Sequence, residues 1–409
     1  MTARTLLQAI RITLTAAVAL ICWGTPAQAA PEDAQTPSRF EADGDSRIVS
    51  AGGDLWLSTL GGYSASDGGG VDAEVLRYQD GEWIPLPPLS EISIAAATQF
   101  AVREQADGGP AIPCLGDSGR PSGSLDSRIQ CFEEGRWVTK SVSPAFRGLK
   151  LAGLDATGPE FTALFTNWNR PRLPKSKRKP RIALGRIEGD RVVPVGPSLK
   201  VGDRFKGSLG QSADGADDVT ADVLIQMTAG RKFGKRFLMT LDEARWRRSA
   251  LPGHSRRNLS SGPVRTAEGV FIGGSERQAS RRLPVFRYQS GRWSKIKGLP
   301  VDPARLWTDG ELFPVGERVW LSSSAMGMGE SQPGVFYEYG TPIDGDTGRF
   351  DPWLLVSQSR AEMTAVSGIA GYDGLPVFLY EQETGPRWYP RAVVDFSFAT
   401  PGPLPTSTE

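Results

Sequence analysis

Histidine is almost missing from this chain, because His254 is the single imidazole among 409 residues. So small a supply leaves little room for imidazole chemistry. Arg256 and Arg257 follow His254 closely, and their charges disfavour a charged imidazole, so we interpret it as a surface-loop residue without a catalytic role. A Gly-x-Ser-x-Gly turn that would expose a nucleophilic serine is also missing. No motif in the sequence indicates a particular reaction.

Long apolar segments are scarce as well. Residues 1–29 contain two arginines, one apolar run and an Ala-Gln-Ala ending, which is typical of a secretory signal peptide cleaved near Ala29. Ile21 precedes Cys22 where a lipoprotein cleavage site needs a small residue, and this disfavours a lipid anchor. No later apolar run reaches the roughly 18 residues of a membrane span. We expect a secreted protein, extracellular or periplasmic, that does not span a membrane.

Cysteine is rare, and the two cysteines of the mature chain form an even pair in an oxidising compartment. We therefore expect a disulfide between Cys114 and Cys131. Closing a loop of that size stabilises the fold by about 3 kcal/mol in the chain-entropy model. Two unpaired buried thiols are the alternative. A zinc site is disfavoured, because two cysteines without a nearby histidine cannot complete the metal's ligand shell.

What the chain does have is a hairpin that returns about every 50 residues, the spacing of a repeat architecture. Its clearest copies are Val75-Leu-Arg-Tyr-Gln-Asp-Gly-Glu-Trp83 and Val285-Phe-Arg-Tyr-Gln-Ser-Gly-Arg-Trp293. Three looser copies cover residues 131–137, 184–192 and 239–246, the second of them with Val192 in place of tryptophan. The chain is therefore predicted to be a string of similar β-units.

Short apolar segments rich in β-branched and aromatic residues open these units, at residues 54–58, 98–102, 160–165, 221–225, 269–272, 318–321 and 376–380. Small-residue strands such as 92–97 precede them and suit the wall of a narrow channel. The pattern predicts an all-β fold, a β-propeller of seven four-stranded blades, with six or eight as alternatives. Within a blade, strands a to d run from the small inner strand to the strand that begins at the tryptophan.

The last unit, residues 364–398, supplies three strands, so residues 38–41 are predicted to complete that blade and close the ring. The expected organisation is a signal peptide at 1–29, a disordered segment at 30–37, one propeller domain at 38–399 and a disordered tail at 400–409. We expect a monomer. The tryptophans Trp83, Trp137, Trp246 and Trp293 are predicted to pack between blades and not to stack on a ligand.

Two units resemble kelch repeats. Leu60-Gly-Gly62 followed by Tyr78 and Trp83, and Ile272-Gly-Gly274 followed by Tyr288 and Trp293, carry that family's double glycine, tyrosine and tryptophan. The resemblance implies a propeller that serves mostly as a binding scaffold, with some secreted relatives that are enzymes. Copper-containing galactose oxidase is excluded, since it uses two histidine ligands. The tryptophan-containing aspartate boxes of sialidases are also missing.

Charge is divided unevenly along the chain, although the formal net charge is only +1. Residues 165–300 hold 29 Lys and Arg against 11 Asp and Glu, so blades three to five form a basic sector. Alternating strand directions would bring the b–c and d–a connections of these blades to one face. We predict that the cations of these connections bind anions: Arg170, Arg172, Lys175, Lys177, Arg178, Lys179, Arg181, Arg231, Lys232, Lys235, Arg236, Arg256, Arg257, Arg281 and Arg282.

The leading hypothesis is a secreted, non-catalytic binding module for an anionic partner, an acidic polysaccharide or an envelope phosphate. A solvated, functionless charge run is the competing interpretation. Nucleic acid is disfavoured, because aromatic residues do not interleave the basic run. An envelope protein–protein scaffold is a further alternative.

The enzymatic alternative is a polysaccharide-degrading enzyme, a glycoside hydrolase or lyase with carboxylates at the channel mouth. It needs no histidine, but Asp155, Asp242 and Asp309 are too generic to choose among. We expect no cofactor. Structural calcium at Asp43-Gly-Asp45 or Asp344-Gly-Asp346 is conceivable from the residue types, yet neither reproduces a full calcium loop, and plain turn chemistry is favoured.

Overall fold

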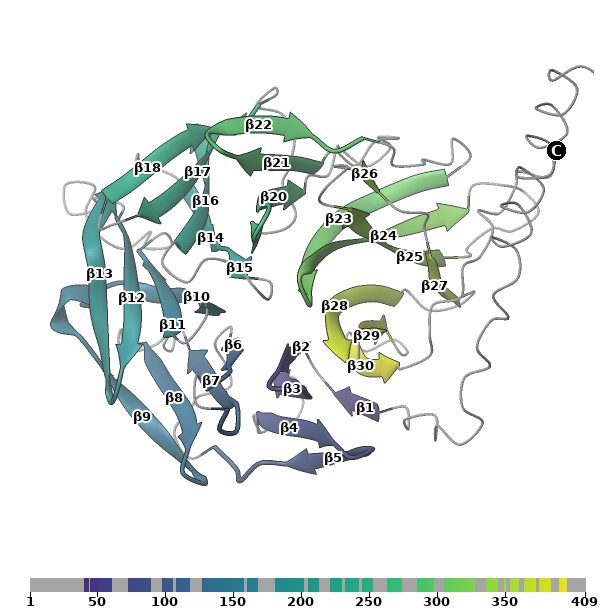
Figure 1. The fold of residues 1–409 in the computed structure, drawn as a ribbon, viewed down its shortest axis with the longest axis horizontal. Coiled ribbons are helices and arrows are strands. Elements are labelled where there is room, and N and C mark those ends of the chain that lie inside the picture. The colour runs from purple at the N-terminus through teal and green to yellow at the C-terminus, as the bar shows by residue number, and fades with distance from the viewer. Residues whose placement is uncertain are drawn as a thin grey trace, which may run out of the picture. The chain divides into compact units, whose positions relative to one another are not determined.

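Strands account for nearly all of the secondary structure in this computed structural model (Figure 1). The chain divides into two units, residues 1–37 and Ser38–Glu409, and every described residue belongs to the second. The described residues are 40–43, 45–60, 73–89, 98–105, 108–117, 127–157, 160–167, 181–201, 205–212, 221–229, 232–242, 245–252, 263–273, 285–297, 305–327, 336–344, 349–350, 354–359, 364–372, 375–383 and 390–395. The predicted signal peptide and both predicted disordered segments lie outside them.

Consecutive strands pair antiparallel in runs that follow chain order. The first run is β2 (Asp45–Ala51), β3 (Asp54–Leu60), β4 (Glu74–Gln79) and β5 (Glu82–Pro85). The next is β6 (Thr98–Arg103), β7 (Ile112–Asp117), β8 (Arg128–Glu133) and β9 (Arg136–Val142). A 3₁₀ turn, Pro144–Phe146, leads to β10 (Lys150–Thr157), β11 (Glu160–Thr166), β12 (Arg181–Glu188) and β13 (Arg191–Lys200).

The second half repeats the scheme. One sheet holds β14 (Phe205–Leu209), β16 (Ala221–Ala229), β17 (Lys232–Asp242) and β18 (Arg245–Ala250). Another holds β15 (Gln211–Ser212), β19 (Val264–Thr266), β20 (Gly269–Gly273), β21 (Val285–Gln289) and β22 (Arg292–Lys295). A third holds β23 (Arg305–Val315), β24 (Arg318–Gly327), β25 (Phe336–Asp344), β26 (Arg349–Phe350) and β27 (Leu354–Ser359). The last holds β28 (Thr364–Tyr372), β29 (Leu375–Glu383), β30 (Pro390–Asp395) and β1 (Phe40–Asp43).

The predicted all-β class is confirmed, and so is the partner of the first strand. β1 pairs antiparallel with β30, with Phe40 opposite Val394 and Asp43 opposite Arg391. The N-terminal strand thus becomes the outer strand of the sheet formed by the C-terminal hairpins. The first strands of neighbouring sheets also contact one another: β2 contacts β6 and β28, β6 contacts β10, and β23 contacts β19 and β28.

The recurring hairpin forms because its turn residues tolerate a left-handed backbone. Asp80 and Gly81 have φ values of 52° and 89°, and Ser290 and Gly291 have 49° and 80°. Two successive positive φ angles give a tight turn whose twist matches that of the paired strands. The turn sets Tyr78 directly opposite Trp83, with ring centroids 5.1 Å apart. The repeat seen in the sequence is therefore a turn with a cross-strand aromatic pair.

The tryptophans of these hairpins join neighbouring sheets, as the sequence predicted. The Trp137 indole Nε1 donates a hydrogen bond of 2.7 Å to the carbonyl of Pro87, which follows β5. Trp246 donates over the same distance to the carbonyl of Pro197 in β13, and Trp293 donates to Ser249 Oγ in β18 at 2.9 Å. A buried indole N–H needs such a partner. We call these three contacts the tryptophan latches.

The third hairpin has Val192 where the others have tryptophan, and its sheet joins its neighbour differently. Val192 is fully buried, and β13 pairs in parallel with β9 at Arg191–Ser141 and Val192–Val142. The two four-stranded runs thereby form one eight-stranded sheet. The smaller side chain permits the outer strands to come within hydrogen-bonding distance, where an indole would hold them apart.

The predicted disulfide is confirmed. Cys114 on β7 is bonded to Cys131, its direct cross-strand neighbour on β8, and both are fully buried. A formed disulfide is typical of proteins in an oxidising compartment, outside the cytosol. Among the described residues, no helix is long and apolar enough to cross a membrane.

Two sequence assignments were wrong. Residues 98–102 were expected to form the second strand of their blade, but they lie in β6, the first strand of the run; the second strand is β7, whose six residues are all buried. The predicted inner strand at 92–97 lies outside the described residues. Residues 231–236 were expected to be a loop, yet Lys232, Lys235 and Arg236 belong to β17, because Arg236 pairs with Gln226 and Lys232 with Ala229.

Candidate functional site

Most of the predicted anion-binding residues lie outside the described residues. Those outside are Arg170, Arg172, Lys175, Lys177, Arg178, Lys179, Arg231, Arg256, Arg257, Arg281 and Arg282. Arg181 is exposed at the start of β12, where its backbone N–H donates to Asn167 Oδ1 at 2.7 Å. The predicted basic face therefore remains a prediction.

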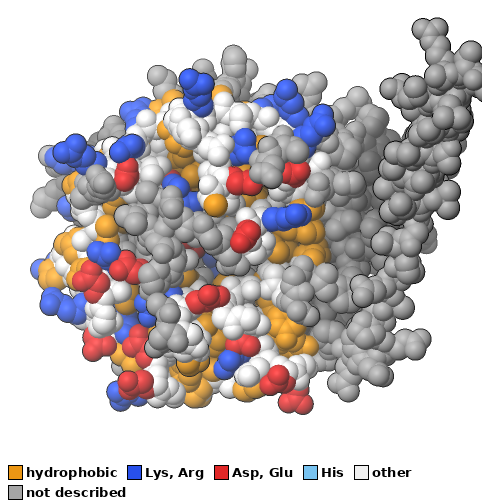
Figure 2. Space-filling model, viewed as in Figure 1, with side chains coloured by type: hydrophobic (Ala, Val, Ile, Leu, Met, Phe, Trp, Pro, Cys, Tyr) orange, Lys and Arg blue, Asp and Glu red, His pale blue; other side chains and the backbone are white. Residues whose placement is uncertain are grey.

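The described cations of the basic sector lie mainly on the outermost strands. Exposed Lys or Arg side chains occur on β13, β18 and β22 at Arg191, Lys200, Arg245, Arg247, Arg248, Arg292 and Lys295. Figure 2 shows Lys and Arg side chains toward the upper edge of the molecule, where β18 and β22 lie in Figure 1. Sequence reasoning missed these strands, because it assigned the cations to connections between strands.

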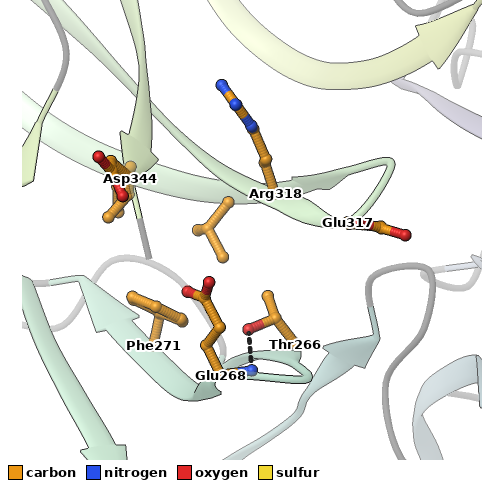
Figure 3. A pocket seen from close by; sticks show the side chains of 8 residues that line it. Thr266, Glu268, Phe271, Glu317, Arg318 and Asp344 are labelled. Carbon is orange, nitrogen blue, oxygen red and sulfur yellow. Dashed lines mark hydrogen bonds between the residues drawn. The ribbon is translucent and has the colours of Figure 1, made fainter. Parts of the chain in front are cut away.

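A pocket lined by three carboxylates lies where the basic sector ends (Figure 3). Its volume is about 150 Å³, and it is formed by Thr266, Glu268, Phe271, Glu317, Arg318, Val319, Ile343 and Asp344. Glu268 lies in the turn between β19 and β20, Glu317 lies in the turn between β23 and β24, and Asp344 ends β25. Two neighbouring sheets thus contribute acids to one concavity.

The pocket's apolar residues and its glycine-containing turn follow from the local sequence. Phe271, Val319 and Ile343 are buried strand residues. Thr266 Oγ1 accepts the Glu268 N–H at 3.1 Å. Gly269 follows with a φ of 132°, and a Cβ there would lie 2.5 Å from the Tyr288 carbonyl oxygen, so only glycine fits. The turn therefore fixes where the Glu268 side chain leaves the backbone, and Figure 3 shows its carboxylate extending toward the middle of the pocket.

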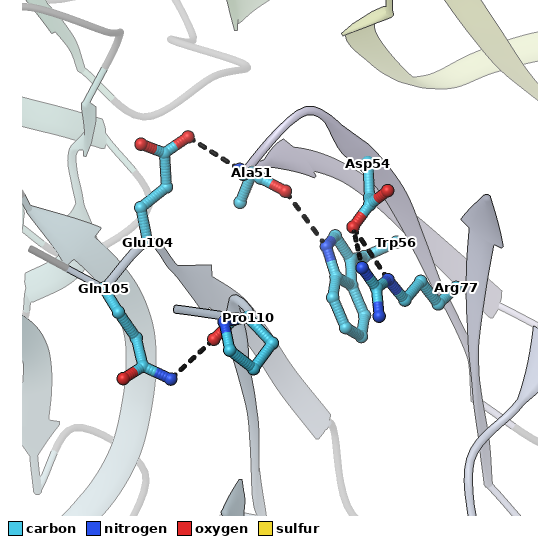
Figure 4. Close-up of polar contacts among 8 residues, drawn as sticks. Ala51, Asp54, Trp56, Arg77, Glu104, Gln105 and Pro110 are labelled. Carbon is cyan, nitrogen blue, oxygen red and sulfur yellow. Dashed lines mark hydrogen bonds and ion pairs between the residues drawn. The ribbon is translucent and has the colours of Figure 1, made fainter. Parts of the chain in front are cut away.

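At the corresponding junction between the first two sheets, a hydrogen bond joins the two sheets. There, the Gly52 N–H in the β2–β3 turn donates to Glu104 Oε1 at 2.6 Å (Figure 4). Gln105 Nε2 donates to the Pro110 carbonyl at 2.6 Å within the connection between β6 and β7 that carries Glu104. Glycine at the turn leaves no side chain to project between the sheets. At the later junction the turns hold Glu268 and Glu317, and both residues line the pocket.

A buried ion pair fixes β19, the strand that leads into the pocket. Asp222 on β16 is 4% exposed, and its Oδ2 accepts a hydrogen bond of 2.6 Å from Arg265 Nε and forms an ion pair of 2.6 Å with Arg265 Nη2. Thr240 Oγ1 donates to its other oxygen at 2.6 Å. Burial raises the pKa of Asp222, while Arg265 and Thr240 act in the opposite direction. The pair links two sheets and has little access to solvent, so we interpret it as structural.

The carboxylates proposed from sequence alone lie elsewhere. Asp155 on β10 accepts a hydrogen bond of 3.3 Å from Ser212 Oγ, and Asp242 forms an ion pair of 2.7 Å with Arg247. Asp344 was singled out, but for turn or calcium chemistry. Glu268 and Glu317 were missed; the one available signal was that both occupy the turn before the second strand of a unit. The described residues contain no group of three or more His, Cys, Asp or Glu that could hold a metal ion.

Neither the family models nor the curated proteins include a match to this sequence. Solved structures do match. A polysaccharide lyase of family PL25, an ulvan lyase bound to -[GlcA(1-4)Rha3S]-, aligns with a TM-score of 0.53 and 11% identity over 85% of this chain and 91% of the lyase. The Penicillium chrysogenum alpha-L-arabinanase complexed with arabinobiose aligns at 0.43 and 14% identity over 74% and 94% of the two chains.

Trypanosoma rangeli sialidase aligns at a TM-score of 0.42 with 12% identity, over 78% of this chain and 57% of the sialidase. Of these three structures, the lyase shares the most of its fold with this chain. At 11% identity that likeness concerns the fold alone. The architecture is thus similar to that of β-propeller enzymes.

Proposed function

We propose that this protein is an exported enzyme that degrades an acidic polysaccharide, by hydrolysis or by elimination. The observation that carries the proposal is the carboxylate-lined pocket between the β19–β22 and β23–β27 sheets, at the edge of a sector rich in cations. This was the alternative interpretation of the sequence, and the pocket supports it over a binding module without chemistry.

Two carboxyl groups beside one pocket can transfer the protons that cleavage of a sugar bond requires. In hydrolysis, one acts as the acid on the leaving oxygen and the other as base or nucleophile. In elimination, one removes a proton from the sugar ring, a carbon–carbon double bond forms, and the other protonates the leaving oxygen as its bond to the ring breaks. Glu268 and Asp344 are the proposed pair, since they come from different sheets and both line the pocket. Arg318, in the same lining, offers a guanidinium that can pair with a substrate carboxylate.

The charge of the neighbouring sector fits an anionic substrate. Between residues 165 and 300, cations outnumber acids by 29 to 11. Such an excess raises the local concentration of a polyanion and speeds its arrival. The ulvan lyase with the similar fold was solved with a repeat that contains a uronic acid and a sulfated sugar. An acidic polysaccharide is therefore the substrate class that we propose.

The proposal includes a closed propeller of seven blades. Support comes from the pairing of β1 with β30 and from the contact between β2 and β28. Tyr78 also packs against Tyr372 with ring centroids 5.4 Å apart, and Trp83 packs on the same cluster of buried residues. These contacts bring the first and last sheets together. Export through the predicted signal peptide is supported by the Cys114–Cys131 disulfide.

A non-catalytic binder of the same polymers, acting through the predicted basic connections, is the second candidate, and the charge division favours it. The two proposals are separated by incubating the purified mature protein with uronate-containing, sulfated and neutral polysaccharides. New reducing ends report hydrolysis, and ultraviolet absorbance of an unsaturated uronate reports elimination. Cleavage of an acidic polymer is the expected result.

Glu268→Gln and Asp344→Asn are expected to reduce the cleavage rate by about 10²-fold or more, because each removes a proton-transfer group. Glu82→Gln, an exposed acid on β5, is the matched control and should leave the rate unchanged. Binding of acidic polymers without any cleavage would support the binding module instead. Unchanged rates in both pocket variants would show that the chemistry takes place elsewhere.

A further inference from the structure

The last strands of three successive antiparallel runs, β13, β18 and β22, carry cations and no acids. We define the outer basic strip as Arg191 and Lys200 on β13, Arg245, Arg247 and Arg248 on β18, and Arg292 and Lys295 on β22, all of them exposed. No Asp or Glu occurs within these three strands. The strip is separate from the pocket lining and from the residues predicted as anion-binding from the sequence.

The strip is continuous because the tryptophan latches hold its strands beside one another. Trp246 of β18 bonds to the Pro197 carbonyl of β13, and Trp293 of β22 bonds to Ser249 of β18. Side chains alternate between the two faces of a strand, so Arg245 and Arg247 share the face of Ser249, which receives Trp293. Those two arginines therefore lie on the face of β18 that meets Trp293 of β22.

Most charges of the strip have no counter-ion within the described part of the chain. Arg247 pairs with Asp242 at 2.7 Å but is still 74% exposed. The Arg248 guanidinium lies over the Phe237 ring, 3.4 Å from its centroid, and the residue is exposed. Arg191, Lys200, Arg245, Arg292 and Lys295 form no ion pair with a described residue. The strip is thus a local excess of positive charge.

Protection of sheet edges accounts for charge on outer strands but not for its sign. A charged residue of either sign discourages pairing with another chain. The outer strand β5 has Glu82, Trp83, Ile84 and Pro85, with no cation. Strand β9 has a single exposed cation, Arg136, because its Lys140 is buried and paired with Glu133 at 2.6 Å. Two or three exposed cations on each of β13, β18 and β22, without an acid in any of these strands, therefore call for a further explanation.

We propose that the outer basic strip binds an acidic polysaccharide chain that crosses β13, β18 and β22, outside the catalytic pocket. The planar guanidinium of arginine suits carboxylate and sulfate groups, because it donates two parallel hydrogen bonds that these groups accept. The choice of a polysaccharide rests on the proposed function. The strip would hold the polymer near the pocket and raise the rate at low substrate concentration without changing the chemistry.

The test compares two triple variants that remove the same charge. Arg245→Ser, Arg247→Ser and Arg292→Ser together disable the strip, whereas Arg136→Ser, Arg147→Ser and Arg349→Ser remove three exposed cations from other parts of the described structure. A third variant with lysine at 245, 247 and 292 retains the charge. Affinity for heparin and for polygalacturonate is measured at low and high salt, with thermal unfolding as the check on folding.

We expect the strip variant to bind these probes about tenfold more weakly than wild type at low salt, and the control variant to stay within about twofold. The lysine variant should retain most of the affinity, since lysine still supplies a point charge. The difference between strip variant and wild type should shrink as salt rises. Equal binding by the strip and control variants would overturn the inference.

The result is separable from that of the proposed function. If wild type cleaves an acidic polymer and both triple variants bind it alike, the strip inference fails and the enzyme proposal stands. If the strip variant loses affinity while wild type cleaves nothing, the inference stands and the enzyme proposal fails. If the strip variant melts early, Lys295→Ser and Arg292→Ser tested singly, each on an exposed position, give the same comparison.

Discussion

The β2–β5 sheet and the β14–β18 sheet are built from the same repeat and differ in what they expose. Both end in an outer strand whose second residue is tryptophan, Trp83 in β5 and Trp246 in β18. Around that tryptophan, β5 has a glutamate, an isoleucine and a proline, and β18 has three arginines. The repeat dictates the hairpin and the indole, whereas the exposed positions beside it are free to vary and can carry function.

The two sheets also use an aspartate–arginine pair at different depths. In the first, Arg77 on β4 pairs with Asp54 on β3 at 2.6 Å, and the two side chains are 27% and 14% exposed. Arg77 also lies over the Trp56 ring, 5.5 Å from its centroid (Figure 4). In the second, Asp222 reaches out of its own sheet to Arg265 on β19, and its side chain is almost wholly buried. One pair reinforces a sheet, and the other joins two sheets.

The largest predicted effect comes from breaking the deeper pair. Arg265→Met leaves a buried carboxylate without its cation and should lower the free energy of unfolding by about 3–5 kcal/mol at neutral pH. Arg77→Met, the matched change at the shallower pair, should cost about 1 kcal/mol. Denaturant unfolding measures both. Similar losses of unfolding free energy in the two variants would contradict the expectation that the more deeply buried pair contributes more to stability.

The pH dependence of stability gives a further test of the deeper aspartate–arginine pair. Burial raises the pKa of Asp222 above its ordinary value of 3.8. The native state therefore keeps the carboxyl proton to a higher pH than the unfolded state does. The free energy of unfolding consequently falls as the pH rises from the unfolded to the folded pKa of this group. Loss of Arg265 raises that pKa further. The deficit of Arg265→Met should therefore be larger at pH 7 than near pH 4. Adding Asp222→Asn removes the charge and should restore part of the stability at pH 7.

A smaller loss of stability is expected from changing the tryptophan that the outer strands of both sheets carry. Trp246→Phe removes the hydrogen bond to the Pro197 carbonyl and should cost about 1–2 kcal/mol, which combines a lost hydrogen bond with lost apolar contact. Trp83→Phe should cost a similar amount, since Trp83 packs on the cluster that joins β2–β5 to β28–β29. Thermal unfolding of both variants checks this. A neutral result at one position would mean that the indole has different roles in the two sheets.

The sequence was sufficient for the hairpins, because their information is local. Asp80-Gly81 and Ser290-Gly291 need only their own backbone to turn, and each turn fixes its cross-strand aromatic pair. β7 was missed for the opposite reason. Pro113 and Gly116 interrupt its β-pattern, yet the strand is held by pairing with β6 and by the disulfide from Cys114, both of them non-local. Likewise, the basic run at 232–236 becomes a strand only because β16 lies beside it.

The pocket could not have been predicted from one sequence. Glu268 and Asp344 are 76 positions apart, and they line one space only because the β19–β22 sheet packs against the β23–β27 sheet. The turn that orients Glu268 was readable, since Thr266 and Gly269 flank it. What the turn faces depends on the angle between two sheets, which no local pattern encodes.

The smallest effect on stability should come from giving β18 the charge sign of β5. Arg245→Glu and Arg247→Glu lie at exposed positions, and surface substitutions of this kind usually change the free energy of unfolding by less than about 0.5 kcal/mol. Loss of the Arg247–Asp242 pair adds little, because an exposed pair is weak. Binding of acidic polymers should nevertheless fall further than in the serine variant, since each glutamate repels the ligand. A variant that unfolds normally but no longer binds would locate the functional difference between the two sheets in the exposed side chains of their outer strands. Loss of stability in step with loss of binding would show that the arginines serve the fold.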